Sequence, residues 1–277
     1  MARFERSLHI AHDGDFICIV APELGNGPLN AVVDAAGAML LAGAALDVGT
    51  AVRFHDRSAP DAPAGNHLPI ITGSAADWSP PVARCRNLES IASALARMKA
   101  LADEHAEGDG LARLAFGLDV PASNMHNNAL VRLAGPRLER LAQWLASDRD
   151  PPRETLGEPP VDLLGLGPGL TPSGDDLLCG VLIALHATRR QQATRALGDA
   201  IARAAPSLTT PLSRAFLAAA ATGEAAESLH RAVNAILEGD LAALPRVAGE
   251  IDRIGHTSGW DATAGAALVL ASSERRR

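Results

Sequence analysis

The sequence has 277 residues, of which 47% are hydrophobic and 3% aromatic, and its formal net charge at pH 7 is −7. This length suits one large domain or two smaller ones with a sizeable core. The acidic balance and the few aromatic side chains argue against a nucleic-acid-binding surface. No apolar stretch reaches the roughly 18 residues of a membrane span, and the N-terminus lacks the apolar segment of a signal peptide. We expect a cytoplasmic protein that binds neither nucleic acid nor membrane.

The three cysteines, Cys18, Cys85 and Cys179, lie far apart and form no Cys-x-x-Cys pair. This spacing argues against a disulfide framework or a zinc site and fits a reducing compartment. Cys179 lies within an apolar run, so we expect a buried small hydrophobic residue there rather than a nucleophile.

The first part of the chain predicts short strands. Apolar runs with Val, Ile and Phe are separated by the turn signals HDGD, GNGP and DVGT. The runs are SLHI (7–10), DFICIVA (15–21), LNAVV (29–33), AMLLA (38–42) and AVRFH (51–55), with LPIIT (68–72) as a further candidate. Strands at this spacing indicate a small sheet or barrel.

From about residue 86 the apolar residues recur at helical spacing. Pro136 predicts a kink or an interruption within the second of the helical segments. The segments are 87–107, 127–146, 175–188, 190–204, 210–222, 224–238, 241–253 and 260–272, with a charged, proline-rich connector at 148–160. We therefore predict an α+β protein, with a β-rich N-terminal region (1–85) followed by a mainly helical region (86–277).

Two stretches of the helical region share one pattern. Residues 165–176 read GLGPGLTPSGDD, and residues 255–270 read GHTSGWDATAGAALVL. Both contain Gly-x-Thr, then Ser-Gly-x-Asp, then three residues and Gly, with Pro172 as the one extra residue of the first stretch. The matched pairs are Gly169 and Gly255, Thr171 and Thr257, Ser173 and Ser258, Gly174 and Gly259, Asp176 and Asp261, and Gly180 and Gly265. This agreement favours a duplicated element.

Each half of the pattern predicts the start of a helix. Ser173 with Asp176, and Ser258 with Asp261, resemble the capping box Ser-x-x-Glu. A glycine one turn into a helix costs roughly 1 kcal/mol relative to alanine. Gly180 therefore indicates a close approach of another backbone, as would occur if the two helices packed on one another.

Two interpretations remain open at this point. In the first, both stretches are capped starts of core helices and nothing more. In the second, they bind a ligand, because a glycine-dense approach to a helix N-terminus exposes backbone N–H groups. We favour the ligand site, whose predicted substrate-binding residues are Gly167, Gly169, Thr171, Ser173, Gly174, Thr257, Ser258 and Gly259.

The neighbouring Asp175 and Asp176 would repel a phosphate unless a cation bridges them or one of them turns away to cap the helix. Mg²⁺ binds one or two carboxylates together with phosphate oxygens, so this pair is the predicted metal site and Mg²⁺ the predicted cofactor. The second stretch adds His256, which could donate to an oxyanion or act as a general acid or base. The candidate catalytic residues are His256, Asp176 and Asp261.

The combination GLGPGLTPSGDD and GHTSGWD resembles the signature of an uncharacterised bacterial family. That family includes a subunit of the oxamate carbamoyltransferase found with genes of anaerobic allantoin degradation, a branch of purine catabolism. The resemblance is densest at 163–180 and 254–266 and weaker at 209–224 (TTPLSRAFLAAAATGE), and the N-terminal part matches only in general character. It implies an enzyme subunit that works with two others, one of them of the acyl-CoA-synthetase type, but it assigns no catalytic residues.

The chemistry implied by the resemblance exchanges a carbamoyl group between oxamate and phosphate, giving carbamoyl phosphate. Such a transfer passes through a tetrahedral oxyanion, for which the Ser and Thr hydroxyls of both stretches are suitable donors. We expect a subunit of a carbamoyltransferase-like complex that binds a small anionic substrate or phosphate. One alternative is a non-catalytic scaffold or regulatory subunit with structural helix caps. Another is a stand-alone metal-dependent phosphotransfer or phosphohydrolase enzyme.

Overall fold

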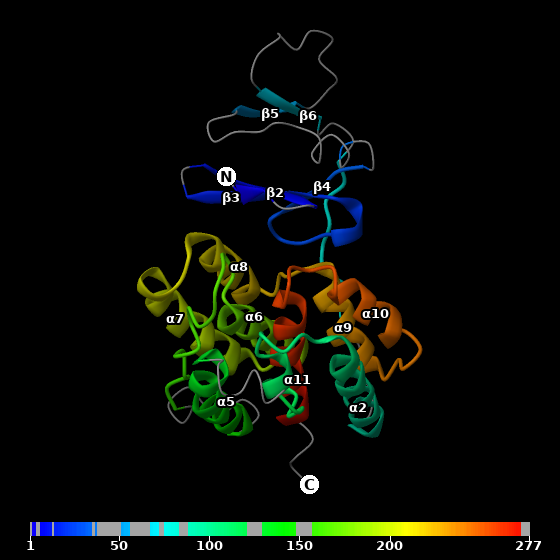
Figure 1. Ribbon diagram of the computed structural model, residues 1–277, viewed down its shortest axis with the longest axis vertical. Coiled ribbons are helices and arrows are strands. Elements are labelled where there is room, and N and C mark those ends of the chain that lie inside the picture. Colours follow the sequence, from blue (N-terminus) through cyan, green and yellow to red (C-terminus); the bar gives the residue numbers. More distant parts are fainter. Residues whose placement is uncertain are drawn as a thin grey trace.

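The computed structural model describes residues 2–3, 6–12, 14–34, 37, 51–55, 67–71, 75–82, 88–120, 129–147 and 157–272. Within these residues the strands come first along the chain and the longer helices follow, as Figure 1 shows. The predicted α+β class is therefore confirmed. The division into regions 1–85 and 86–277 stays a prediction.

The N-terminal sheet contains four strands in the order of the chain. These are β1 (Ala2–Arg3), β2 (Ser7–His12), β3 (Asp15–Val20) and β4 (Asn30–Val32). The first three are antiparallel and β4 is parallel to β3. A second, parallel pair is formed by β5 (Ala51–His55) and β6 (His67–Ile71). The predicted strands are thus found, except AMLLA (38–42), which lies outside the described residues.

Apart from the short α3, which was not predicted, the helices follow the predicted segments closely. Their bounds are α2 (Leu88–His105), α3 (Ala112–Ala115), α5 (Ala129–Ala146), α6 (Ser173–Ala187), α7 (Gln191–Leu208), α8 (Pro211–Ala221), α9 (Glu227–Glu238), α10 (Leu244–Ile251) and α11 (Ser258–Ser272). The interruption expected at Pro136 is wrong, because α5 continues through it. Residues on both sides of this proline, Val131 and Leu138, are buried. The kink at Pro136 stays a prediction. No helix among the described residues is long and apolar enough to cross a membrane.

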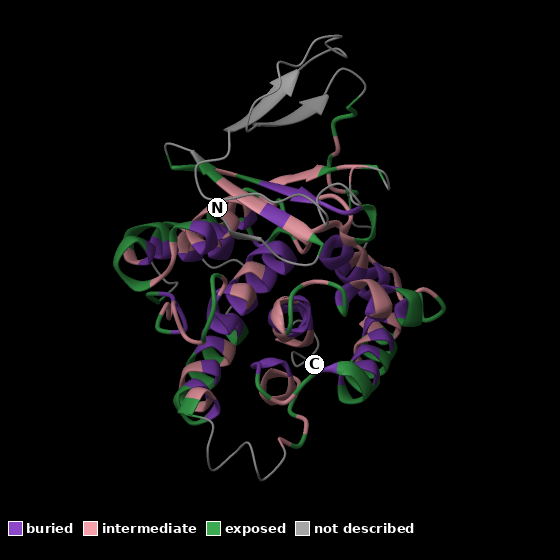
Figure 2. Cartoon of the chain, turned by 45° about the horizontal axis from the view of Figure 1, so that its top comes forward, coloured by how far each residue is buried: buried purple, intermediate pink, exposed green. Residues whose placement is uncertain are grey.

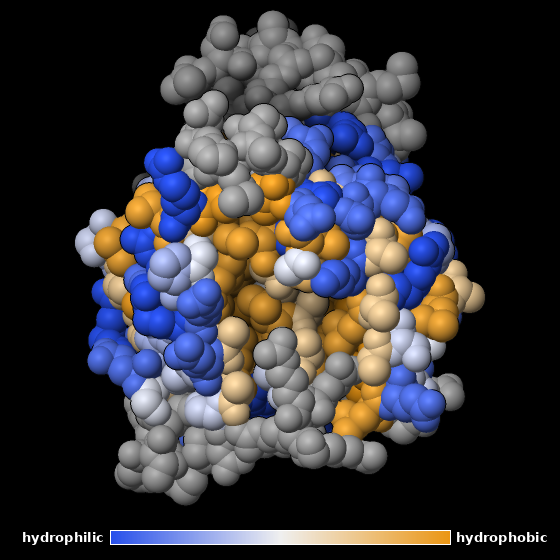
Figure 3. Space-filling view, turned by 60° about the horizontal axis from the view of Figure 1, so that its bottom comes forward, coloured by the Kyte–Doolittle hydropathy of each residue, from blue (hydrophilic) through white to orange (hydrophobic). Residues whose placement is uncertain are grey.

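The core is built around α6 and α11, which make the most extensive contact of any two elements. In Figure 1 they lie between α5, α7 and α8 on one side and α2, α9 and α10 on the other. Figure 2 shows that the buried residues of the surrounding helices face this centre. Seen from below, hydrophobic residues gather along the middle of the molecule between two polar flanks (Figure 3). The sheet of β1–β4 lies in the upper part of the view, above the helices and away from the C-terminus (Figure 1).

The contact between α6 and α11 depends on two glycines at matched positions of the duplicated pattern. A Cβ atom added to Gly180 would lie 1.7 Å from the carbonyl oxygen of Ala262, and one added to Gly265 would lie 2.0 Å from that of Leu177. Leu177 and Ala262 each follow a matched aspartate, so the contact is reciprocal. The close backbone approach predicted from the sequence is confirmed.

We expect Gly180→Ala to lower the free energy of unfolding by at least about 2 kcal/mol, because the added methyl group forces the two helices apart. Urea denaturation followed by circular dichroism measures this change. The matched control is Gly135→Ala in α5, where a Cβ atom meets nothing within 4 Å. There we expect a gain of roughly 0.5–1 kcal/mol from helix propensity. Equal effects at the two positions would contradict the packing argument.

Candidate functional site

The duplicated stretches converge at the start of α6 and α11. The hydroxyl oxygens of Thr171 and Ser258 lie 3.2 Å apart, and those of Ser173 and Thr257 lie 3.5 Å apart. Each contact joins the threonine of one stretch to the serine of the other. The structure therefore brings four of the predicted substrate-binding side chains into one group.

The predicted capping role of Ser173 is wrong. Ser173 is the first residue of α6, Pro172 occupies the N-cap position, and no side chain caps this end of the helix. The Ser173 hydroxyl instead faces Thr257 of the other stretch. Backbone carbonyl oxygens, instead of a capping side chain, accept hydrogen bonds from the N–H groups of Gly174, Asp175 and Asp176.

Two of the glycines predicted to bind substrate have packing roles. A Cβ atom on Gly174 would lie 2.0 Å from the carbonyl oxygen of Leu163, and one on Gly259 would lie 2.4 Å from that of Ile251. Each thus allows its helix to begin against the preceding segment. Gly169 differs, because it has a φ of +95° and open space around its Cβ position. It lines the cavity described below.

Asp175 holds the structure together instead of facing a ligand. Its side chain is fully buried and accepts hydrogen bonds from the backbone N–H of Gly165 at 2.7 Å, from the Ser213 hydroxyl at 2.6 Å and from the Thr209 hydroxyl. These bonds fix the start of α8 and the glycine-rich loop against α6. With its oxygens engaged in this way, Asp175 has no evident place as a Mg²⁺ ligand.

Asp176 and Asp261 occupy matched positions and both carry a raised pKa. Burial raises the pKa of Asp176 well above its usual value, and the charges of Asp261 and Asp175 raise it further, against the lowering effect of the Ser258 and Thr171 hydroxyls. Burial raises the pKa of Asp261 to about 6, although the hydroxyls of Thr257 and Ser173 oppose this shift. Within the described part of the chain, one oxygen of each carboxyl group is buried without a hydrogen-bond partner. These surroundings favour the protonated form of each carboxyl group.

The Asp261 carboxyl group also tethers a distant segment. Its Oδ1 accepts hydrogen bonds from the N–H groups of Leu111 at 2.7 Å and Ala112 at 2.8 Å, at the start of α3. A Cβ atom on the adjacent Gly110 would lie 2.8 Å from the same oxygen. The sequence gives no sign of this contact, since the residues are about 150 positions apart.

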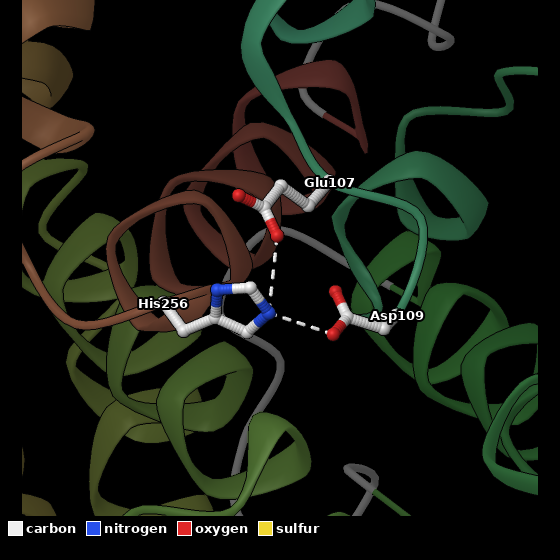
Figure 4. Close-up of side chains that lie close together, drawn as sticks. All are labelled: Glu107, Asp109 and His256. Atoms are coloured by element: carbon white, nitrogen blue, oxygen red, sulfur yellow. Dashed lines mark hydrogen bonds and ion pairs between the residues drawn. The ribbon is translucent and has the colours of Figure 1, made fainter.

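His256 lies in an exposed cluster at the edge of the site (Figure 4). Its Nε2 atom is 2.7 Å from Asp109 Oδ2 and 3.0 Å from Glu107 Oε2. The hydrogen bond to Asp109 and the two negative charges raise the pKa of the imidazole. Among the described residues, these three side chains are the group of His, Cys, Asp and Glu arranged closely enough to hold a metal ion, and the predicted Asp175–Asp176 pair does not belong to it. The acidic turn EGDG (107–110) is visible in the sequence, but nothing there links it to His256.

A cavity of about 690 Å³ lies between the N-terminal sheet and the converging stretches. Thr171, Ser173, Asp176, Thr257 and Ser258 line one side of it. The opposite wall, which includes Arg6, His9, Cys18 and Val20, comes from β2, β3 and the residue before β2. Cys179 is half-buried and also lines the cavity, with burial raising the pKa of its thiol. This wall from the N-terminal sheet was missed by the sequence analysis.

We expect Asp175→Asn to lower the free energy of unfolding by about 2–3 kcal/mol, because an amide NH₂ would face donors that a carboxylate now accepts. Thermal and urea unfolding measure the loss. Asp77→Asn is the control, since Asp77 is exposed and bonds to no other described residue. A loss no larger than that of the control would contradict the structural role of Asp175.

The raised pKa of Asp261 predicts a stability that depends on pH. The folded-state pKa is about 6 and the unfolded value is about 3.9, so ionisation opposes folding. The wild type should lose stability relative to Asp261→Asn as the pH rises from about 4 to about 6, at no more than about 1.4 kcal/mol per pH unit. Above that range the difference should be constant. Urea unfolding of both proteins at several pH values tests this, and a constant difference throughout would contradict it.

Comparisons with known proteins give a match to a family model. No curated protein and no solved structure matches the chain. Residues 163–270 match the family model described as oxamate carbamoyltransferase subunit AllH, and this range contains both duplicated stretches and the helices between them. This match over residues 163–270 supports membership of the family of the oxamate carbamoyltransferase subunit AllH.

Proposed function

We propose that this chain supplies the transfer site of a carbamoyltransferase, and that the site is the part of the cavity where the duplicated stretches meet. The observation that supports this is the group of four hydroxyls beside two carboxyl groups of raised pKa. Hydroxyl donors and a protonated acid are what an acyl transfer at neutral pH requires.

The proposed reaction moves a carbamoyl group between the nitrogen of oxamate and phosphate. A phosphate oxygen attacks the carbonyl carbon of the carbamoyl group, and the carbonyl oxygen becomes an oxyanion. The bond between that carbon and the oxamate nitrogen then breaks, the nitrogen takes up a proton, and oxamate and carbamoyl phosphate leave. Each step is reversible.

The residues of the site fit these steps. The hydroxyls of Thr171, Ser173, Thr257 and Ser258 would donate to the oxyanion. Asp176 lines the cavity and holds a proton because of its raised pKa, so it would protonate the leaving nitrogen. The negative charge of Asp261 would help Asp176 to keep its proton, because it raises the pKa of Asp176. His256, at the edge of the cavity, would exchange protons with solvent.

The proposal includes partner subunits and routes no step through a metal. One partner would be of the acyl-CoA-synthetase type, as the family resemblance implies, and the setting would be allantoin degradation in the cytoplasm. The predicted Mg²⁺ is not carried forward, since Asp175 accepts three protein hydrogen bonds. One observation favours the alternative of a structural subunit: Gly174, Gly259 and Asp175 all have packing or tethering roles.

The experiment that decides between these functions is an assay of the purified chain, alone and with its partner subunits, for phosphate-dependent formation of carbamoyl phosphate from N-carbamoyl oxamate. We expect activity only with the partners. We expect Ser258→Ala to lower kcat by about 10²–10³-fold through loss of an oxyanion donor. Ser207→Ala, at an exposed serine near the end of α7, is the matched control.

Other outcomes identify the alternatives. Full activity without partners would favour the stand-alone enzyme. An active complex in which both Ser258→Ala and Asp176→Asn keep the wild-type rate would favour the scaffold and overturn the proposed site.

A further inference from the structure

The proposed site has a charge problem. Its substrates are anions, but the part of the cavity formed by the duplicated stretches offers hydroxyls, the carboxyl group of Asp176 and the imidazole of His256, which is already paired with Asp109 and Glu107. The backbone N–H groups at the start of α6 and α11 give little help, because protein carbonyls accept those of Gly174, Asp175, Asp176, Gly259 and Asp261. A substrate carboxylate or phosphate therefore needs a cation from elsewhere in the cavity.

Two arginines line the same cavity from different parts of the chain. Arg6 lies immediately before β2 in the N-terminal sheet, and Arg253 lies just after α10, close to the second stretch. Both residues are exposed. Within the described part of the chain, neither guanidinium group has a hydrogen bond or an ion pair, whereas Arg113, Arg140 and Arg231 are paired with acidic side chains.

The other charged groups of the cavity do not occupy these arginines. Asp109 is bonded to His256, and Asp176 has a pKa raised well above its usual value. His9 has a pKa lowered by burial, which favours its neutral form. Glu224 is an exposed residue of the lining, and its carboxylate has no hydrogen bond or ion pair among the described residues. The cavity therefore has two unpaired guanidinium groups against one unpaired carboxylate.

We infer that Arg6 and Arg253 bind the anionic groups of the substrate, from the sheet side and the helical side of the cavity, and so determine its specificity for small oxyanions. A guanidinium group donates two parallel hydrogen bonds to a carboxylate or a phosphate, which suits both oxamate and phosphate. This inference rests on the proposed function, because it assigns the charge-recognising residues of that same cavity. Arg6 lies outside residues 163–270, the part that matches the family.

The remaining lining supports a ligand with a small charged group. Val20, Leu24, Leu212 and Phe216 contribute apolar surface and no charge. Such surface offers no hydrogen bond to an oxyanion, so the polar contacts of the ligand come from other side chains of the lining. It also leaves the arginines as the anion-binding side chains of the cavity that are charged at every pH near neutrality.

The test is isothermal titration calorimetry of the full chain with oxamate, with inorganic phosphate and with oxamide, the neutral diamide analogue of oxamate. We expect the wild type to bind the two anions and not oxamide. Arg6→Ala and Arg253→Ala should each weaken the dissociation constant for the anion by about tenfold or more, as the loss of hydrogen bonds to a charged group predicts. Separate titrations with oxamate and phosphate show which anion each arginine binds. Arg6→Lys and Arg253→Lys should lie between the wild type and the alanine variants.

The matched control is Arg195→Ala on α7, an exposed arginine with no ion pair among the described residues and outside the cavity lining. Its dissociation constants should equal those of the wild type, and the melting temperatures of all variants should be unchanged. Alanine variants that bind both anions as tightly as the control does would overturn the inference. So would a wild type that binds oxamide as tightly as oxamate, or that binds neither anion. The transfer assay of the assembled complex is a separate readout, so the proposed function can stand when this inference fails.

Discussion

The reciprocal contact between α6 and α11 is the constraint on which the rest of the structure depends. Because Gly180 and Gly265 have no side chain, a carbonyl oxygen of each helix can occupy the space where a Cβ atom of the other would lie. This close approach holds the two helix starts together, and with them the threonine and serine hydroxyls of both stretches. Gly174 and Gly259 lie six residues earlier, where each lets its helix begin against the preceding segment. The candidate site thus lies at the N-terminal ends of the two packed helices, α6 and α11.

The two halves differ at the position before the matched aspartates, and that difference joins each half to different neighbours. In α6 the residue is Asp175, which binds Thr209 and Ser213 and so fixes α8. In α11 it is Trp260, whose Nε1 donates to Asp252 at 2.6 Å beyond the end of α10 and whose ring stacks on His105 of α2. The matched residues of the two stretches form the contact between α6 and α11. The residue that differs joins α6 to α8 and joins α11 to α2 and the end of α10.

Local periodicity and composition predicted most of the elements, and the matched spacing of the two stretches predicted that their helices would pack together. The errors concern which group each side chain bonds to. Ser173 fits a capping pattern, but it meets the hydroxyl of Thr257, which its own helix cannot reveal. Asp175 fits a metal pair until Thr209 and Ser213 are placed beside it. Arg6 and Asp109 carry no local signal, because their relation to the cavity arises only when the sheet and the loop before α3 fold over it.

The duplication also explains why two acids lie at or beside the proposed anion site. When two duplicated helix starts pack on one another, their matched residues come close together. The charge of Asp261 therefore raises the pKa of its matched residue, Asp176. Burial and this repulsion both favour the protonated form, which turns a group that would repel an anion into one that can donate to it. The paired helix starts therefore favour the uncharged form of Asp176 in the cavity, and neither duplicated stretch contributes an arginine or a lysine. The structure places Arg6 and Arg253 on the cavity lining, at positions that neither half of the duplicated pattern contains.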